Sequence, residues 1–349
     1  MHSPRSLPSL AEMLRARRGP NIIRGGRIRE LFVPAMKIGF KGIVTVELIH
    51  AATGLVKQRL QFENLITDVG LNALGSALTI EQLVNSYIEV GTGSTAPANA
   101  DTGLVAPVSP RTNSNGGITE VAGSGSGYAY WYRRIVRVFT EAQVNGNLTE
   151  FGLFSASTAG TMWCRQLFKD GLGDPTTITK TSLDQLKITY EIRGYSPTVD
   201  TTGTVTLNSV NYDWTSRAAN IATSAAWGAT AGGGVLKAFG GGNWSNGSLV
   251  AYDSHTLGTT SQGIQGSSTS AENDTFSAAA YTTDTFYRDL TGIWSPSIAN
   301  FGAGIGGYEM RFMSTASARG FQTVFSAFIP KDNTMRLTLV SRVSWGRYV

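Results

Sequence analysis

The stretch that decides the fold lies near the start of the chain and consists of two strand-like runs, Ile43–Ile49 (IVTVELI) and Leu55–Phe62 (LVKQRLQF). The first run is rich in β-branched residues, and the second alternates apolar and polar side chains as a half-buried strand does. The residues between them, Ala51–Gly54 (AATG), supply a turn. The sequence therefore predicts a β-hairpin over residues 43–62.

More strands are predicted after the hairpin, at short intervals and separated by turn residues, which is typical of a β-sandwich or barrel. Thr67 or Asp68 should cap a short helix that ends near Gly75. Residues 105–127 are rich in Pro, Ser, Asn and Gly and are expected to form a long loop. The strands of this part are expected at Tyr87–Val90, Tyr128–Thr140, Leu148–Phe154 (pairing back on the preceding strand), Trp163–Phe168 and Leu186–Arg193.

A domain boundary is expected at residues 194–203, beyond which charge becomes sparser and small residues more frequent. The predicted fold class is mainly β. Two β-sandwich-like domains, residues 37–198 and 199–349, follow a short, basic and partly helical N-terminal arm, residues 1–36. The last residues, Ser344–Val349, include two aromatic side chains and should be held in a sheet or an interface.

The positive charge of the chain is concentrated in the arm. The whole chain has a net charge of +5, and residues 1–36 alone hold seven arginines and two glutamates. A basic arm can bind phosphate backbones or an acidic groove on a partner. Alternatively, Met36 is the natural start and residues 1–35 are an upstream extension. The partner-docking residues expected in the arm are Arg15, Arg17, Arg18, Arg24, Arg27 and Arg29.

The composition is that of a protein that works outside a cell, yet the chain lacks the features of secretion. Only 15% of its residues are charged, and 41 of 349 are glycine. Residues 1–36 hold no apolar run suited to a signal peptide, and one cysteine, Cys164, cannot close an intramolecular disulfide. We therefore expect a chain that is made and folded in cytosol, released by lysis and not inserted in a membrane.

Residues suited to catalysis or metal binding are scattered. The histidines His2, His50 and His255 have no metal-pair spacing, so neither a metal nor a cofactor is expected. Cys164 is expected to be a small buried residue. The expectation is a protein without enzymatic activity, with a glycan depolymerase as an alternative. That alternative would draw its two carboxylates from Asp213, Asp253, Asp274, Asp284, Asp289 and Glu309.

Four aromatic residues lie in a glycine-rich stretch of the second domain, residues 226–253. Exposed aromatic rings in such loops can stack on sugar rings or fill a partner's pocket. They can equally close the core of the domain, with the glycines shaping turns. These candidate glycan or partner contacts are Trp227, Phe239, Trp244 and Tyr252.

Three segments resemble tailed-bacteriophage virion structural proteins. They are Phe62–Gly75 (FENLITDVGLNALG), Ile88–Leu104 with its VGTG and DTxL motifs, and Glu150–Phe154 (EFGLF). The resemblance covers about residues 38–193. It implies a structural role in the tail, baseplate or fibre, and it implies no catalytic residues.

The function expected is that of a non-enzymatic structural component of a tailed-phage virion that acts by oligomeric assembly. Its partners would be other virion proteins and copies of itself in a trimer or ring. Host surface polysaccharide is a further expected partner, and direct nucleic-acid contact is a lesser hypothesis that depends on the arm alone. The alternatives are a receptor-binding module for host glycan and a capsid decoration protein.

Overall fold

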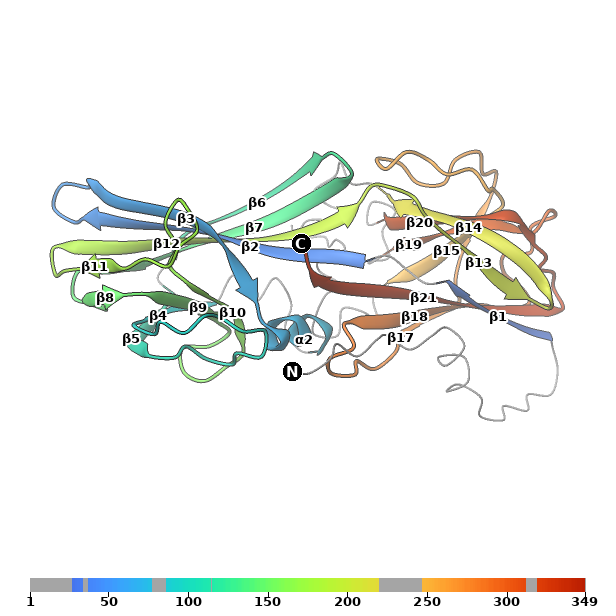
Figure 1. Cartoon of the computed structure of the whole chain (residues 1–349). Helices are drawn as coiled ribbons and strands as arrows, with labels where there is room; N and C mark the ends of the chain where they lie inside the picture. The colour runs from blue at the N-terminus through green and yellow to red at the C-terminus, as the bar shows by residue number, and fades with distance from the viewer. Residues whose placement is uncertain are drawn as a thin grey trace.

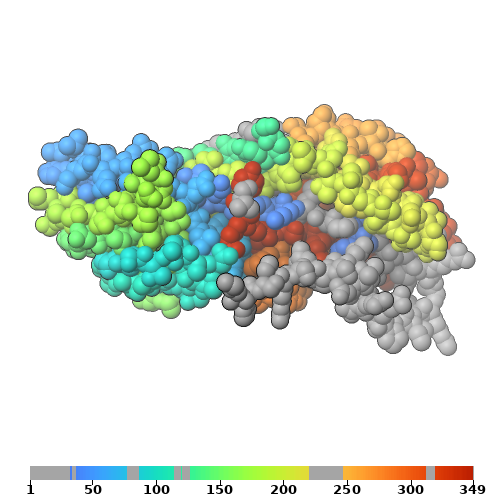
Figure 2. All heavy atoms as spheres, viewed as in Figure 1, coloured from blue at the N-terminus to red at the C-terminus, as the bar shows by residue number. Residues whose placement is uncertain are grey.

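A computed structural model describes residues 27–33, 37–76, 86–113, 115–219, 247–311 and 319–348. The mainly β fold class is confirmed, because nearly all the regular structure in these residues is strand. The molecule is elongated, with a first lobe (blue to green) and a second lobe (yellow to red, with one blue strand) placed end to end (Figures 1 and 2). The named helix in the described part, α2 (Asp68–Ser76), has nine residues, so no helix there could cross a membrane.

The predicted hairpin is the centre of the first lobe. Strands β2 (Lys37–His50) and β3 (Val56–Ile66) pair antiparallel. Gly54, in the turn, has φ of 70°, which favours a residue without a side chain. β12 (Asp184–Pro197), β7 (Tyr128–Phe139) and β6 (Asn115–Gly125) extend the sheet on the β2 side.

A second layer covers one face of this sheet in Figure 1, and the core lies between the layers. Phe62 from β3 meets Phe151 and Phe168 there, with ring centroids 5.9 and 6.3 Å away. The main strands of the second layer are β4 (Tyr87–Gly91), β5 (Pro107–Thr112), β9 (Glu150–Phe154) and β10 (Met162–Leu167), with the small pair β8 (Gly146–Leu148) and β11 (Ile178–Lys180). β9 and β10 are buried along their length because both of their faces are covered, whereas the edge strand β5 is largely exposed.

The second lobe also has two layers. The hydroxyls of Tyr308 and Ser341 lie 3.1 Å apart, one from each layer. Gly292 permits close packing, because a Cβ there would lie 2.9 Å from the Leu249 side chain. One layer holds β13 (Thr201–Leu207), β14 (Val210–Ala218), β20 (Arg319–Ile329), β19 (Ile305–Arg311), β15 (Ser248–Tyr252) and β16 (Ser270–Glu272). The other holds β17 (Thr275–Ala278), β18 (Tyr287–Trp294), β21 (Met335–Arg347) and β1 (Arg27–Val33).

Strand β21 joins the two lobes into one sheet. It pairs in parallel with β1 over residues 335–341, and then with the start of β2 over residues 344–347. The predicted limit of the arm at residue 36 therefore has to be corrected, since residues 27–33 are a strand of the sheet and Val33 is buried. The predicted second domain, residues 199–349, likewise contributes strands to the same sheet as the first.

Two further predictions for the first lobe are wrong. Residues 105–127 are not a long loop, because β5 and β6 lie within them. The prolines that favoured a loop are on β5, which pairs on one side with β4 and so tolerates them. Residues 148–154 do not pair back on β7, because β9 lies between β4 and β10 in the other layer.

The expected anchoring of the C-terminus is confirmed. β21 runs to Arg347, and the backbone N–H of Tyr348 donates to the Phe40 carbonyl at 2.8 Å. The Tyr348 ring stacks on Tyr195 with centroids 3.9 Å apart. The end of the described chain is therefore fixed against the first lobe, at the middle of the molecule (Figure 2).

Candidate functional site

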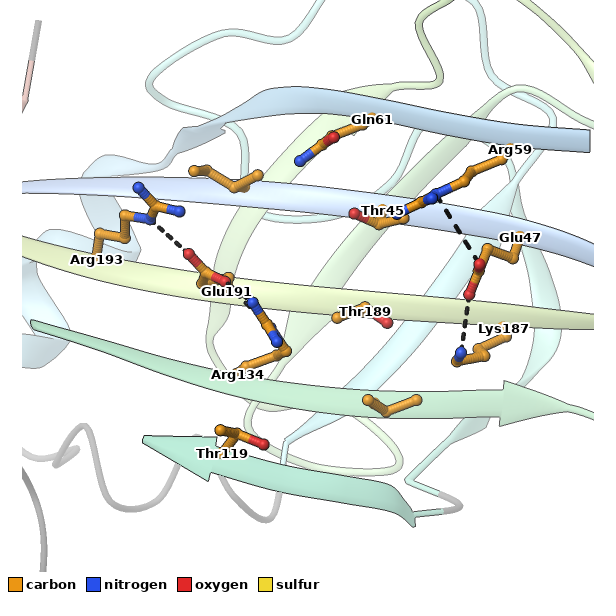
Figure 3. Close-up of a pocket in the computed structure, with 12 residues that line it drawn as sticks. Thr45, Glu47, Arg59, Gln61, Thr119, Arg134, Lys187, Thr189, Glu191 and Arg193 are labelled. Carbon is orange, nitrogen blue, oxygen red and sulfur yellow. Dashed lines mark hydrogen bonds and ion pairs between the residues drawn. The ribbon is translucent and has the colours of Figure 1, made fainter. Parts of the chain in front are cut away.

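One face of the sheet β6–β7–β12–β2–β3 packs on the core, and the other carries a hollow of about 460 Å³. Along β7 the residues alternate strictly between buried and half-buried, so every second side chain lies on the open face. We call the hollow the outer groove (Figure 3). It is lined by Ile43, Thr45, Glu47, Arg59, Gln61, Thr119, Arg134, Val136, Lys187, Thr189, Glu191 and Arg193.

Each of two glutamates in the outer groove is shared by two cations (Figure 3). Glu191 accepts from Arg134 Nη2 at 2.8 Å and from Arg193 Nε at 2.5 Å. Glu47 lies 2.8 Å from Lys187 Nζ and 3.9 Å from Arg59 Nε. Each of these ion triads therefore has a net charge of +1.

Neutral hydroxyl and amide groups lie between the two ion triads. Thr45 on β2 is the direct neighbour of Thr189 on β12 and of Gln61 on β3. Figure 3 shows these three side chains between Glu191 and Glu47. The floor of the outer groove thus offers hydroxyl and amide groups with one excess positive charge at each end.

Five tyrosines gather on the same side of the sheet, beyond the Glu191 triad. Arg193 joins the two groups, since its guanidinium lies 5.1 Å from the ring centroid of Tyr130 and 5.6 Å from that of Tyr132. A hollow of about 270 Å³ adjoins the cluster. We call Tyr128, Tyr130, Tyr132, Tyr195 and Tyr348 the tyrosine cluster.

A second polar assembly is centred on Glu150, whose side chain is fully buried together with that of Arg165. The Glu150 carboxylate accepts from Arg165 Nε at 2.8 Å and from the backbone N–H groups of Gly93, Val105 and Ala106 at 3.1, 3.3 and 2.9 Å. Arg165 also donates to Asp101 Oδ2 at 2.7 Å. These bonds tie the loop of residues 92–106 to β9 and β10, which is a structural task.

Several residues predicted from the sequence to make partner contacts fall outside the described residues, and the others belong to regular strands. Tyr252 is 7% exposed, and its hydroxyl donates to Glu309 Oε2 at 2.7 Å, so its ring is part of the second lobe's interior. Arg27 and Arg29 lie in β1, paired with β21. The residues outside the described part are Arg15, Arg17, Arg18 and Arg24 of the arm, and Trp227, Phe239 and Trp244.

The acidic residues considered for glycan cleavage each have partners within the protein. Glu309 is buried and contacts Arg311 and Arg319 as well as Tyr252. Asp289 pairs with Arg342 at 2.8 Å. The remaining four accept hydrogen bonds: Asp213 from Thr204, Asp253 from Ser267 and Ser268, Asp274 from Ser295, and Asp284 from Asn72.

The expected burial of Cys164 is confirmed. Its side chain is 0% exposed, and burial raises the pKa of the thiol to about 12. A thiol with this pKa is protonated at neutral pH, which disfavours the thiolate form that a nucleophile requires. Within the described ranges, no three His, Cys, Asp or Glu side chains are grouped as a metal site would require.

The outer groove was not predicted from the sequence, although the alternation of each strand already indicated which of its side chains share a face. The alternation in β2 and β12 placed Thr45 and Glu47 on one face, and Lys187, Thr189 and Glu191 on one face. The missing information was that these two strands are neighbours in register, with some 140 residues between them. No family model, curated protein or solved structure matches the chain.

Proposed function

We propose that this chain is a non-enzymatic structural component of a tailed-phage virion, in the tail, baseplate or fibre apparatus, and that it acts by oligomeric assembly. One observation carries the proposal. The three segments that resemble tailed-phage structural proteins are separated in the sequence, but in the fold they form one hydrogen-bonded unit.

The first segment is connected to the rest of this unit by Thr67, the residue that caps α2. Thr67 Oγ1 donates to the Met162 carbonyl at 2.8 Å and accepts from Gly70 N–H at 3.1 Å, so one hydroxyl both caps α2 and fixes it to β10. Asp68 N–H donates to the Asn99 carbonyl at 2.8 Å, which joins the first segment to the second.

The third segment supplies the anchor. Glu150, the first residue of EFGLF, holds the backbone of the VGTG loop through Gly93 and the loop's far end through Ala106. A Cβ on Gly93 would lie 2.3 Å from Glu150 Oε1, which gives the second glycine of VGTG a steric reason. The motif residues therefore depend on each other for their geometry, which supports treating the three resemblances as one combined signal.

The architecture of the chain also suits a subunit of a larger assembly. The two lobes share one sheet through β21, so a load on one lobe is carried to the other by backbone hydrogen bonds. β6, β13 and β16 each pair on one side in the described chain, and a second chain can add to such strand edges. Identical subunits joined in this way favour closed rings or trimers.

The mass of the full-length chain in solution tests the proposed assembly. Light scattering at physiological salt over a wide concentration range should give a closed trimer or ring. A chain lacking residues 1–26 should form an oligomer with the same number of subunits if the sheets carry assembly, and with fewer subunits if the arm does. A monomer at every concentration for both chains would refute assembly as the mode of action.

A further inference from the structure

We infer that the outer groove binds a linear acidic polysaccharide, with its ion triads on the carboxylates and its threonines on the hydroxyls of the sugar chain. This role does not depend on the proposed virion function. It also involves other residues than the glycan contacts predicted at Trp227, Phe239, Trp244 and Tyr252.

The outer groove has a net positive charge. The groove holds four cations and two carboxylates, and the adjoining pair of Lys41 and Glu63, 2.9 Å apart, adds no net charge. The excess of +2 lies in two places, since each ion triad has a surplus of one. Lys187 and Glu191 are four residues apart on β12, so the centres of excess charge lie about 13 Å apart along the strand. This pattern favours an extended anion over a single anionic group.

Hydrogen-bonding chemistry distinguishes a polysaccharide from a nucleic acid. Glu47 and Glu191 remain acceptors inside the groove, where they can accept hydrogen bonds from the free hydroxyls of a sugar chain, which the backbone of DNA lacks. Thr45, Thr189 and Gln61 can each donate and accept. A mixed floor of donors and acceptors is complementary to a polyhydroxylated chain.

The tyrosine cluster extends the same surface. Tyr130 and Tyr132 are half-buried and stacked, with centroids 6.4 Å apart and planes at 16°. Aromatic faces next to hydrogen-bonding groups suit the apolar faces of pyranose rings. Arg193 contacts both these rings and Glu191, so a chain leaving the groove at this end would pass from ion triad to aromatic surface.

A second copy of the protein fits the outer groove less well. Two such faces brought together would place net positive charge against net positive charge, which opposes association. The groove is also largely polar, whereas stable subunit interfaces have an apolar centre.

Binding of the full-length chain to three polyuronates tests the inference: polygalacturonate, alginate and hyaluronate. Affinity is measured at low salt, with dextran as a neutral polymer and a thymidine oligonucleotide as a polyanion of different chemistry. We expect binding to at least one polyuronate, weaker binding to both comparison polymers, and loss of affinity as salt rises.

Two groove variants separate charge from hydroxyl recognition. R59Q/K187Q removes two half-exposed or exposed cations and should weaken polyuronate binding by about tenfold or more. T45V/T189V keeps the shape and the charge of both residues and should weaken it by about three- to tenfold, without affecting the oligonucleotide. The control K169Q/R217Q removes two cations outside the groove and should bind as the unaltered chain does.

Three results would overturn the inference. The first is absence of binding to all three polyuronates. The second is oligonucleotide binding of equal strength together with an unchanged affinity of T45V/T189V, which would indicate non-specific contact with polyanions. The third is a fall in oligomeric mass for R59Q/K187Q without any polysaccharide binding, which would assign the groove to a second copy of the chain.

Discussion

Replacing Glu150 by glutamine is expected to destabilise the first lobe severely, although the change is isosteric. Glu150 is 0% exposed, and its partner Arg165 is 1% exposed. Its carboxylate oxygens accept four hydrogen bonds, one from Arg165 Nε and three from the loop backbone. A glutamine offers a single oxygen, so its amide N–H groups must face donors at the position of the other oxygen.

The expected loss of stability in E150Q follows from the number of hydrogen-bond donors around residue 150 that lose their acceptor. Whichever way the amide is turned, two hydrogen bonds to a buried charge are lost, each worth about 1.5–3 kcal/mol. Breaking a buried ion pair by removing one partner costs about 3–5 kcal/mol, which agrees with that sum. We therefore expect E150Q to lower the free energy of unfolding by about 3–5 kcal/mol.

The assay is urea unfolding of the full-length chain followed by tryptophan fluorescence, with E63Q as the matched control. Glu63 is 64% exposed and pairs with Lys41, so E63Q should cost less than about 1 kcal/mol. Amide hydrogen exchange provides a local measure, because the N–H groups of Gly93 and Ala106 donate to Glu150 and should lose protection in E150Q. A cost for E150Q as small as that of E63Q would refute the anchoring role of Glu150.

Further predictions concern the loop, an acidic group and the first strand. G93A should destabilise the first lobe, because the added Cβ would lie 2.3 Å from Glu150 Oε1. G103A is the control and should not destabilise it, because a Cβ there would have no atom within 4 Å. Equal urea midpoints for the two variants would contradict this prediction. Hydrogen bonds from Thr181 and then Lys57 lower the pKa of Asp184 to about 2. The unaltered chain should therefore have a larger free energy of unfolding than D184N above about pH 4, and this difference should decline as the pH falls towards 2. A difference that stays constant over this range would contradict the prediction. Deleting residues 1–33 removes β1 and buried Val33 and should lower the free energy of unfolding in urea by at least about 2 kcal/mol relative to a chain that lacks residues 1–26 alone; equal values for the two chains would contradict this.

Local sequence patterns predicted the elements of the fold better than their arrangement. The hairpin β2–β3 and the cap at Thr67 follow from alternation, a turn and a hydroxyl, all within a few residues. The pairing of β21 with β2 joins residues some 300 positions apart, and no local pattern encodes it. The extent of the arm was misjudged for the same reason, since β1 is a strand only because β21 lies beside it.

The arginines of β7 show a similar limit at the level of side chains. Three arginines among aromatic residues favour a strand whose polar side faces a partner or an ion-pair ladder, and Arg134 does belong to such a ladder through Glu191. Arg133 and Arg137, however, lie on the face of β7 that packs on the core. Arg137 is 1% exposed and donates from Nε to the Ser86 carbonyl at 2.9 Å. Burial of a charge depends on acceptors supplied from other parts of the chain, which the sequence of the strand does not contain.

The most direct test of the proposed virion role is whether the chain copurifies with phage particles. Particles released by lysis of the bacterium that carries the gene are banded on a density gradient, and each fraction is analysed by quantitative mass spectrometry. We expect the chain to peak with the particles, in a fixed ratio to their other proteins and in a copy number that fits a ring or trimers. Recovery of the chain only in fractions free of particles would contradict it.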